Sequence, residues 1–219
     1  MKFYMMIQEK QPGCGLGYFD VVLYDKHYED WCAVQHGYFP WYANATKQGP
    51  RQKLPNGMVL VGKSKKYTVA VRQIARNLYA INRQFFQACE ETGVAFLDLE
   101  PVDFKAQGGA IDNPLSYHAA SFMKYPTATV VVEGSKLTIG EYGRIEGFSE
   151  LQLNDVGNAV FRIEGFSASI DTLFCTEDFK VRAEALKVRG IAFVSLEGND
   201  SDALHLDVPP SPFRVPLCI

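Results

Sequence analysis

The chain has 219 residues, 47% of them hydrophobic and 21% charged, and a formal net charge of −3. This size and balance are those of an ordinary globular protein that buries a core in one large domain or two small ones. No apolar run approaches the roughly 20 residues that span a bilayer, and the apolar start of the chain is too short for the core of a signal peptide. We therefore predict a cytoplasmic protein without a membrane partner.

A glycine-rich stretch, "GCGLG" at Gly13–Gly17, follows a predicted strand near the N-terminus. It resembles a dinucleotide-binding turn, but that motif needs a third glycine where Tyr18 stands, and no clear helix follows. We interpret the stretch as a flexible turn.

An aromatic cluster between Tyr18 and Tyr42 holds nine aromatic residues, including both tryptophans. Its last part, "HGYFPWY", has no regular period and contains Pro40, so we expect a loop. Aromatic side chains with a polar tip gather at protein interfaces. The cluster is therefore either a partner-binding surface or a small core wedge beneath the N-terminal sheet. In the first case the anchoring residues are Trp31, Phe39, Trp41 and Tyr42.

Charge is distributed unevenly along the chain. The stretch from Trp31 to Cys89 has no acidic residue, and its nine basic residues are Lys47, Arg51, Lys53, Lys63, Lys65, Lys66, Arg72, Arg76 and Arg83. The rest of the chain holds 13 of the 22 basic residues against all 25 acidic ones. Near the C-terminus, Gly190–Phe213 contains no Lys or Arg and four acidic residues, Glu197, Asp200, Asp202 and Asp207. Such asymmetry either guides a partner or is neutralised within the fold.

Two segments carry matching signals for a strand followed by a helix. We predict helices over Arg83–Thr92 and Glu177–Val188. Each is preceded by a residue whose side chain can accept a hydrogen bond from the first helical turn, Asn82 in one segment and Thr176 in the other.

The strands that leave these helices match as well. "GVAFLDLE" from Gly93 and "GIAFVSLE" from Gly190 share Gly, Ala, Phe, Leu and Glu in register. Each glycine suits the left-handed turn that ends a helix, and the spacing makes the second helix about one turn longer. We expect the two units to superpose, with Phe96 and Phe193 both buried.

These units predict the fold class. We expect a mixed α+β protein with mostly antiparallel sheets and a few flanking helices, in one compact body over residues 1–219. Its two distantly related strand–helix–strand halves are 1–113, which is basic and aromatic-rich with its unit at 78–101, and 114–219, which is β-rich with its unit at 172–198 and an acidic end.

The hexapeptide "RIEGFS" occurs at Arg144–Ser149 and again at Arg162–Ser167. Two copies without a third do not form a repeat array. We interpret each copy as a strand end whose glycine allows a bulge or bend. Alternating patterns predict hairpins around Gly134–Ser135 and Asp155–Asn158.

The sequence contains no recognised catalytic motif: no G-x-S-x-G elbow, no Walker loop and no H-E-x-x-H helix. Cys32 and His36 have the spacing of a ligand pair on a helix, but no second pair exists, so a structural role is favoured over a metal site. The five scattered cysteines favour reduced thiols over disulfides. We predict no enzymatic activity, no cofactor and no metal.

A characteristic order of segments runs from Leu78 to Glu197. "FFQACEETGVAFLDLEPVDF" is followed by "YHAASF", and later "VFRIEGF" is followed by an apolar pair, a cap, a helix and "GIAF". This order resembles a family of bacterial immunity proteins encoded beside polymorphic toxins or type VI secretion effectors. The resemblance implies an antitoxin that acts by protein–protein interaction with one cognate secreted toxin, and it assigns no residue roles.

Two functional hypotheses follow. As an immunity protein, the chain would cover the toxin's active site or substrate path, with Glu197, Asp200, Asp202 and Asp207 steering association and the four aromatic residues anchoring the complex. The acidic stretch could mimic a nucleic acid if the toxin is a nuclease. The alternative is a nucleic-acid-binding protein that uses the basic stretch 47–83 and the neighbouring aromatics. The acidity of the rest of the chain argues against nucleic acid as the partner.

Overall fold

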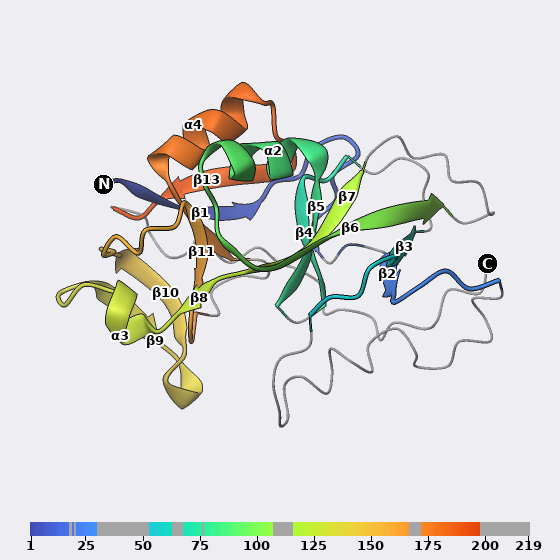
Figure 1. Cartoon of the computed structure of the whole chain (residues 1–219). Helices are drawn as coiled ribbons and strands as arrows, with labels where there is room; N and C mark the ends of the chain where they lie inside the picture. Colours follow the sequence, from blue (N-terminus) through green and yellow to red (C-terminus); the bar gives the residue numbers. More distant parts are fainter. Residues whose placement is uncertain are drawn as a thin grey trace.

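Strands form most of the secondary structure of this protein (Figure 1). The computed structural model describes residues 1–17, 19, 21–29, 53–62, 68–75, 77–106, 116–166 and 172–197. Within these residues lie three sheets and three α-helices, and most strand pairs are antiparallel. The predicted mixed α+β fold with mostly antiparallel sheets is confirmed. The relationship between two halves stays a prediction.

The five-stranded sheet has the order β13-β1-β12-β11-β8, and its one parallel pair is β8 with β11. The first strand of the chain, β1, lies between β12 and β13 and is antiparallel to both. Both faces of β1 are buried, which explains its nearly continuous apolar sequence "FYMMIQ". The strand bounds are Phe3–Gln8 (β1), Lys124–Tyr125 (β8), Val160–Ile163 (β11), Leu173–Thr176 (β12) and Ile191–Ser195 (β13).

The six-stranded sheet has the order β2-β3-β6-β7-β5-β4, with β3 and β6 as its parallel pair. Both sheets use strands from either side of the predicted division at residues 113 and 114, because β1 joins the five-stranded sheet and β7 joins the six-stranded one. The strand bounds are Val21–Tyr24 (β2), Val59–Gly62 (β3), Val71–Ala75 (β4), Leu78–Asn82 (β5), Phe96–Ala106 (β6) and Tyr117–Phe122 (β7).

Both predicted helices are present, and their caps are as expected. Helix α2 spans Arg83–Glu91 and helix α4 spans Glu177–Ala185. The Phe85 N–H donates to the side chain of Asn82 at 2.9 Å, and the Phe179 N–H donates to the hydroxyl of Thr176 at 3.4 Å. Each cap satisfies one of the free N–H groups of a first turn.

The predicted end of the second helix is wrong. The left-handed residue that ends α2 is Gly93 (φ 69°), but its counterpart after α4 is Lys187 (φ 55°) and not Gly190. The next residue closes the same bond in both helices, from Val94 to the carbonyl of Cys89 at 2.9 Å and from Val188 to the carbonyl of Ala183 at 3.0 Å. Both helices therefore have nine residues, and α4 is not one turn longer.

One hydrophobic core is shared by both sheets and both long helices. Helices α2 and α4 lie side by side (Figure 1), and the rings of Phe85 and Phe179 are 5.2 Å apart between centroids. Tyr4 and Met6 of β1 reach this core from one sheet, and Phe122 of β7 reaches it from the other. The helices therefore cover the seam between the two sheets.

The two strand–helix–strand units have the same connections. Each unit lies in a set of four neighbouring strands, with the order β4-β5-β7-β6 beside α2 and the order β11-β12-β1-β13 beside α4. Every neighbouring pair in both sets is antiparallel. Phe96 and Phe193 both pack against the shared core, but each is half-buried and not fully buried as predicted.

A two-stranded ribbon covers the face of the five-stranded sheet that is opposite to the helices. It consists of β9 (Lys136–Ile139) and β10 (Ile145–Glu150), and the short helix α3 (Thr127–Val130) lies beside it. Phe148 and Val130 pack with the inner residues of the sheet in a second core cluster. We call Lys136–Glu150 the β9–β10 ribbon. Its turn projects away from the rest of the described structure (Figure 1).

The hairpin turns do not lie where the sequence predicts them. The ribbon turns at Glu141–Gly143 instead of Gly134–Ser135, and β11 pairs with β8 and β12 instead of with β10. The first "RIEGFS" copy forms nearly the whole of β10 and not a strand end as predicted, whereas β11 ends within the second copy at Ile163. The first contains a register shift between Ile145 and Gly147, and the second bends at Gly165 (φ 75°).

Gly190 lies where the two sheets meet and does not end a helix. Its carbonyl accepts a hydrogen bond from the Arg72 guanidinium at 3.0 Å, and its φ is 76°. A Cβ at this position would lie 3.0 Å from the Cβ and 3.1 Å from the Sγ of Cys14. Glycine is therefore required here both by the left-handed backbone and by the close approach of the "GCGLG" turn.

The Gly190→Ala variant tests this packing against a matched control. Gly93→Ala also places a side chain at positive φ, but nothing lies within 4 Å of the added Cβ, so it should lose about 1–2 kcal/mol in free energy of unfolding. Gly190→Ala should lose about 1–3 kcal/mol more, because the added methyl group overpacks the junction. Urea unfolding measures both variants, and equal losses would contradict the packing argument.

Candidate functional site

Glu197 is the one predicted contact residue that lies in the described part of the chain. The Cys32/His36 pair lies outside the described residues. So do the other predicted contact residues, which are Trp31, Phe39, Trp41, Tyr42, Asp200, Asp202 and Asp207. Their roles stay predictions.

The end of β13 fixes the position of Glu197. The Leu151 N–H donates to the carbonyl of Leu196 at 2.9 Å, and Glu150 faces Glu197 in an antiparallel bridge. The Glu197 N–H donates to the Ser195 hydroxyl at 3.3 Å. The ribbon is thereby fastened to the end of the five-stranded sheet, and the exposed side chain of Glu197 stands at that joint.

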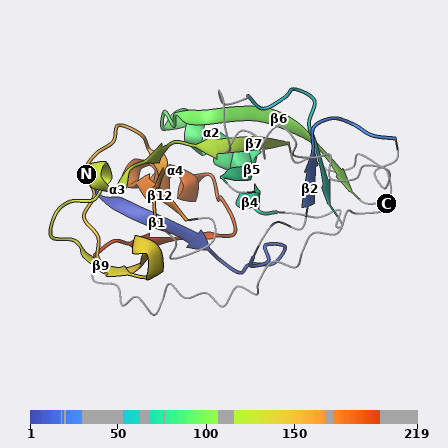
Figure 2. The same cartoon turned by 90° about the horizontal axis from the view of Figure 1, so that it is seen from below.

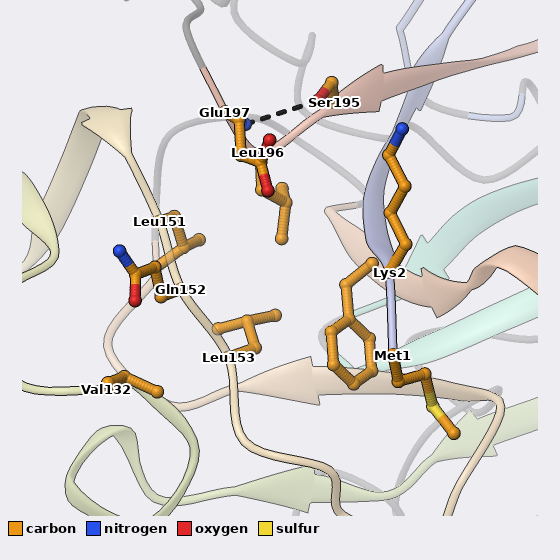
Figure 3. A pocket seen from close by; sticks show the side chains of 10 residues that line it. Met1, Lys2, Val132, Leu151, Gln152, Leu153, Ser195, Leu196 and Glu197 are labelled. Atoms are coloured by element: carbon orange, nitrogen blue, oxygen red, sulfur yellow. Dashed lines mark hydrogen bonds between the residues drawn. The ribbon is translucent and has the colours of Figure 1, made fainter.

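An open cavity of about 260 Å³ lies beside this joint. Figure 3 shows Leu151, Gln152 and Leu153 on one side of it, Met1 and Lys2 on the other, and Leu196 with Glu197 at one end. Its lining combines leucine side chains with an amide, an ammonium and a carboxylate. This volume lies below the roughly 300–1,000 Å³ of typical small-molecule pockets, and a shallow mixed surface of this kind suits a protein side chain.

The ammonium group of Lys2 belongs to an internal set of interactions at the rim. The pKa of Lys2 is raised, first by its hydrogen bond with Tyr4 and further by Glu177 and Glu197. The same tyrosine hydroxyl donates to the Glu177 carboxylate at 3.2 Å. Glu197 is thus within electrostatic reach of a cation, and its exposed carboxylate still faces solvent.

The chain around the ribbon is acidic. Segment 131–156 carries five acidic and two basic residues, Glu133, Glu141, Glu146, Glu150, Asp155, Lys136 and Arg144. One of its two cations, Lys136, lies 3.1 Å from the Glu150 carboxylate. We call segment 131–156 together with Glu197 the acidic region.

The ribbon also exposes two bulky apolar side chains that the sequence analysis did not single out. Tyr142 is 90% exposed and Ile139 is 54% exposed, three residues apart at the ribbon turn. The alternating sequence pattern predicts the turn at Gly134–Ser135 and not at Tyr142–Gly143. The pattern of burial could not be read from the sequence, because the ribbon's inward face is set by the sheet beneath it.

A second hollow lies along α2. It has a volume of about 510 Å³ and is lined by Arg83, Phe86, Gln87, Glu90, Glu91, Ser116 and His118. The His118 ring stacks on Phe86 with centroids 4.1 Å apart and planes at 27°. Its Nδ1 is buried and makes no hydrogen bond within the described structure. Burial lowers the pKa of His118, and Glu90 opposes this effect.

The basic stretch is only partly exposed among the residues that the structure describes. Arg72 is 1% exposed, whereas Lys53 and Arg83 are exposed. A buried guanidinium cannot contact phosphates, so Arg72 drops out of the nucleic-acid hypothesis. The other basic residues of the stretch lie outside the described residues.

No protein-family model and no curated protein matches this chain. In the described ranges, no group of three or more His, Cys, Asp or Glu side chains could hold a metal ion. None of the helices described there is long and apolar enough to cross a membrane.

The lowered pKa of His118 predicts a pH effect on stability. Below the pKa of about 6.5 for an unfolded histidine, the unfolded chain binds this proton more readily than the folded one, so the free energy of unfolding falls as pH falls. Replacing His118 with Phe keeps a ring against Phe86 and removes the titration. Urea unfolding between about pH 7 and pH 5 should show a smaller loss for His118→Phe than for the native chain. Equal losses would contradict this assignment.

Proposed function

We propose that this chain is an immunity protein that binds a cognate secreted antibacterial toxin and neutralises it by covering its active site or substrate path. It acts by binding alone, without catalysis. The proposal builds on the resemblance of Leu78–Glu197 to immunity proteins. The structural observation that supports it is the acidic region, where Glu197 and the acidic ribbon stand exposed at one end of the molecule.

The acidic region suits a partner whose working surface is positive. A toxin that acts on nucleic acid or another polyanion needs a basic cleft, and a negative protein surface is complementary to it. Opposed potentials raise association rates toward about 10⁸–10⁹ M⁻¹s⁻¹ at low salt. Rapid capture matters because toxin that stays free does damage before equilibrium is reached.

We also propose that the two strand–helix–strand units are distantly related halves. Support comes from their shared strand order and from the equivalent caps at Asn82 and Thr176. In the unit around α4, the N-terminal strand β1 occupies the position that β7 occupies in the unit around α2. Their helices pack together through the Arg182–Glu91 ion pair. The ion pair therefore links the helices of the two units across the boundary between them.

The direct test is neutralisation of the toxin encoded in the gene beside this one. Cells that express the toxin should survive when the chain is co-expressed, and the two proteins should co-purify. In a titration of purified toxin, activity should reach its minimum at a fixed stoichiometric ratio. Inhibition by a small fraction of an equivalent would indicate catalysis. Death of cells that contain abundant folded chain would refute the proposal.

Steering has its own kinetic test. Changing Glu197 to Gln and Asp200, Asp202 and Asp207 to Asn should slow association and flatten its dependence on salt, while the melting temperature stays the same. Glu197→Gln alone has a matched control in Asp103→Asn, because each removes one exposed acid. If Asp103→Asn slows association as much as Glu197→Gln does, net charge and not the acidic stretch guides the toxin.

For the predicted aromatic anchors we expect an effect on the dissociation rate and not on the association rate. Trp41→Ala should leave the association rate unchanged and speed dissociation, because anchors act on the lifetime of a complex. Surface plasmon resonance with immobilised toxin measures both rates. Unchanged dissociation would remove Trp41 from the interface.

A further inference from the structure

We infer that the turn of the β9–β10 ribbon, Glu141–Arg144, is the element that enters the toxin's cleft, with Tyr142 as its anchoring side chain. This inference rests on the proposed function and assigns its contact surface. Among the described residues, Tyr142 is the most exposed bulky apolar side chain, at 90%. Ile139, the last residue of β9, is 54% exposed, and the turn that follows it projects from the described structure (Figure 1).

The conformation of the turn disfavours tyrosine. Tyr142 has φ 61° and ψ 23°, Gly143 has φ 69°, and the Arg144 N–H donates to the carbonyl of Glu141 at 3.5 Å. Two central residues with positive φ define a type I′ hairpin turn, whose first central position favours Asn, Asp or Gly. A tyrosine there strains the backbone and exposes a ring to water. Folding therefore does not explain this residue, whereas burial in a partner does.

The base of the ribbon holds the turn in place. The Gly140 N–H donates to the carbonyl of Arg144 at 2.8 Å, which closes the ribbon next to the turn, and the exposed Glu146 carboxylate lies against Gly140. Behind the turn, Phe148 is fully buried and its ring lies 6.0 Å from that of Phe166. A turn fixed in this way loses little conformational entropy when it binds.

The charges around the turn specify the chemistry of its partner. Glu141 and Glu146 are exposed on either side of Tyr142, and Arg144 is the one cation of the turn itself. Segment 131–156 has an excess of three acidic residues over basic ones. The complementary surface is a cleft with an apolar floor for the ring and basic side chains on its rim. The acidic region of a second copy would present like charge to the turn and is disfavoured as its partner.

Replacing Tyr142 with Asn separates binding from folding, because the two effects have opposite signs. Asn suits the left-handed position, so the melting temperature should stay the same or rise. Loss of a central aromatic anchor should raise the Kd for the toxin of the adjacent gene about 30-fold or more, mostly through faster dissociation. Tyr142→Phe keeps the ring and should bind within a few-fold of the native chain.

Two further variants make the outcome decisive. Val181→Asn changes another exposed apolar side chain, on α4, and should leave binding unchanged. Tyr142→Gly suits positive φ as well and replaces Tyr142→Asn if that variant folds poorly. If the native chain fails to bind or protect, the proposed function falls and this inference falls with it. If the native chain binds and the folded Tyr142 variants bind equally well, the function stands and the anchor assignment is wrong.

Discussion

A buried guanidinium joins the two sheets of this protein. Arg72 lies on β4 of the six-stranded sheet, and its Nη1 donates to the carbonyl of Gly190 at 3.0 Å, directly before β13 of the five-stranded sheet. Its Nη2 donates to the carbonyl of Gly15 at 3.1 Å in the N-terminal turn. A buried cation is tolerated where its donors are satisfied, and carbonyl groups from two separate segments meet that need here. The constraint explains why Gly190 must be glycine and why "GCGLG" approaches it so closely.

The position of the acidic region depends on this junction. Strand β13 starts at the residue after Gly190, runs antiparallel to β1 and ends where Leu196 accepts the hydrogen bond of Leu151. The ribbon is held at that point and by Phe148 in the core beneath it. Figure 2 shows β1 and β9 at one end of the molecule and β2 at the other. A buried arginine in one sheet thus helps to fix a projecting turn on the far side of the other.

Local signals in the sequence predicted the two nine-residue helices and their caps, but not the hairpin turns. The caps Asn82 and Thr176 were predictable because each needs one side chain beside one free N–H group. The end of α4 was not, because Lys187 takes a left-handed conformation that glycine usually marks. Residues 127–130, "TATV", form a helical turn although β-branched residues favour strands. The sequence predicts a contact role for Glu197 from its charge, whereas the role proposed for Tyr142 rests on exposure and backbone angles that the sequence does not show.

The most direct test of the proposed binding through the acidic region is hydrogen–deuterium exchange of the chain alone and in complex with the proposed partner, a toxin encoded by an adjacent gene. Amides of an exposed turn exchange readily in the free protein, whereas those of central strands such as β1 are protected. We expect the complex to slow exchange across residues 136–146 and to leave exchange in β1 unchanged. Slowed exchange confined to other surfaces, with 136–146 exchanging as in the free chain, would contradict it.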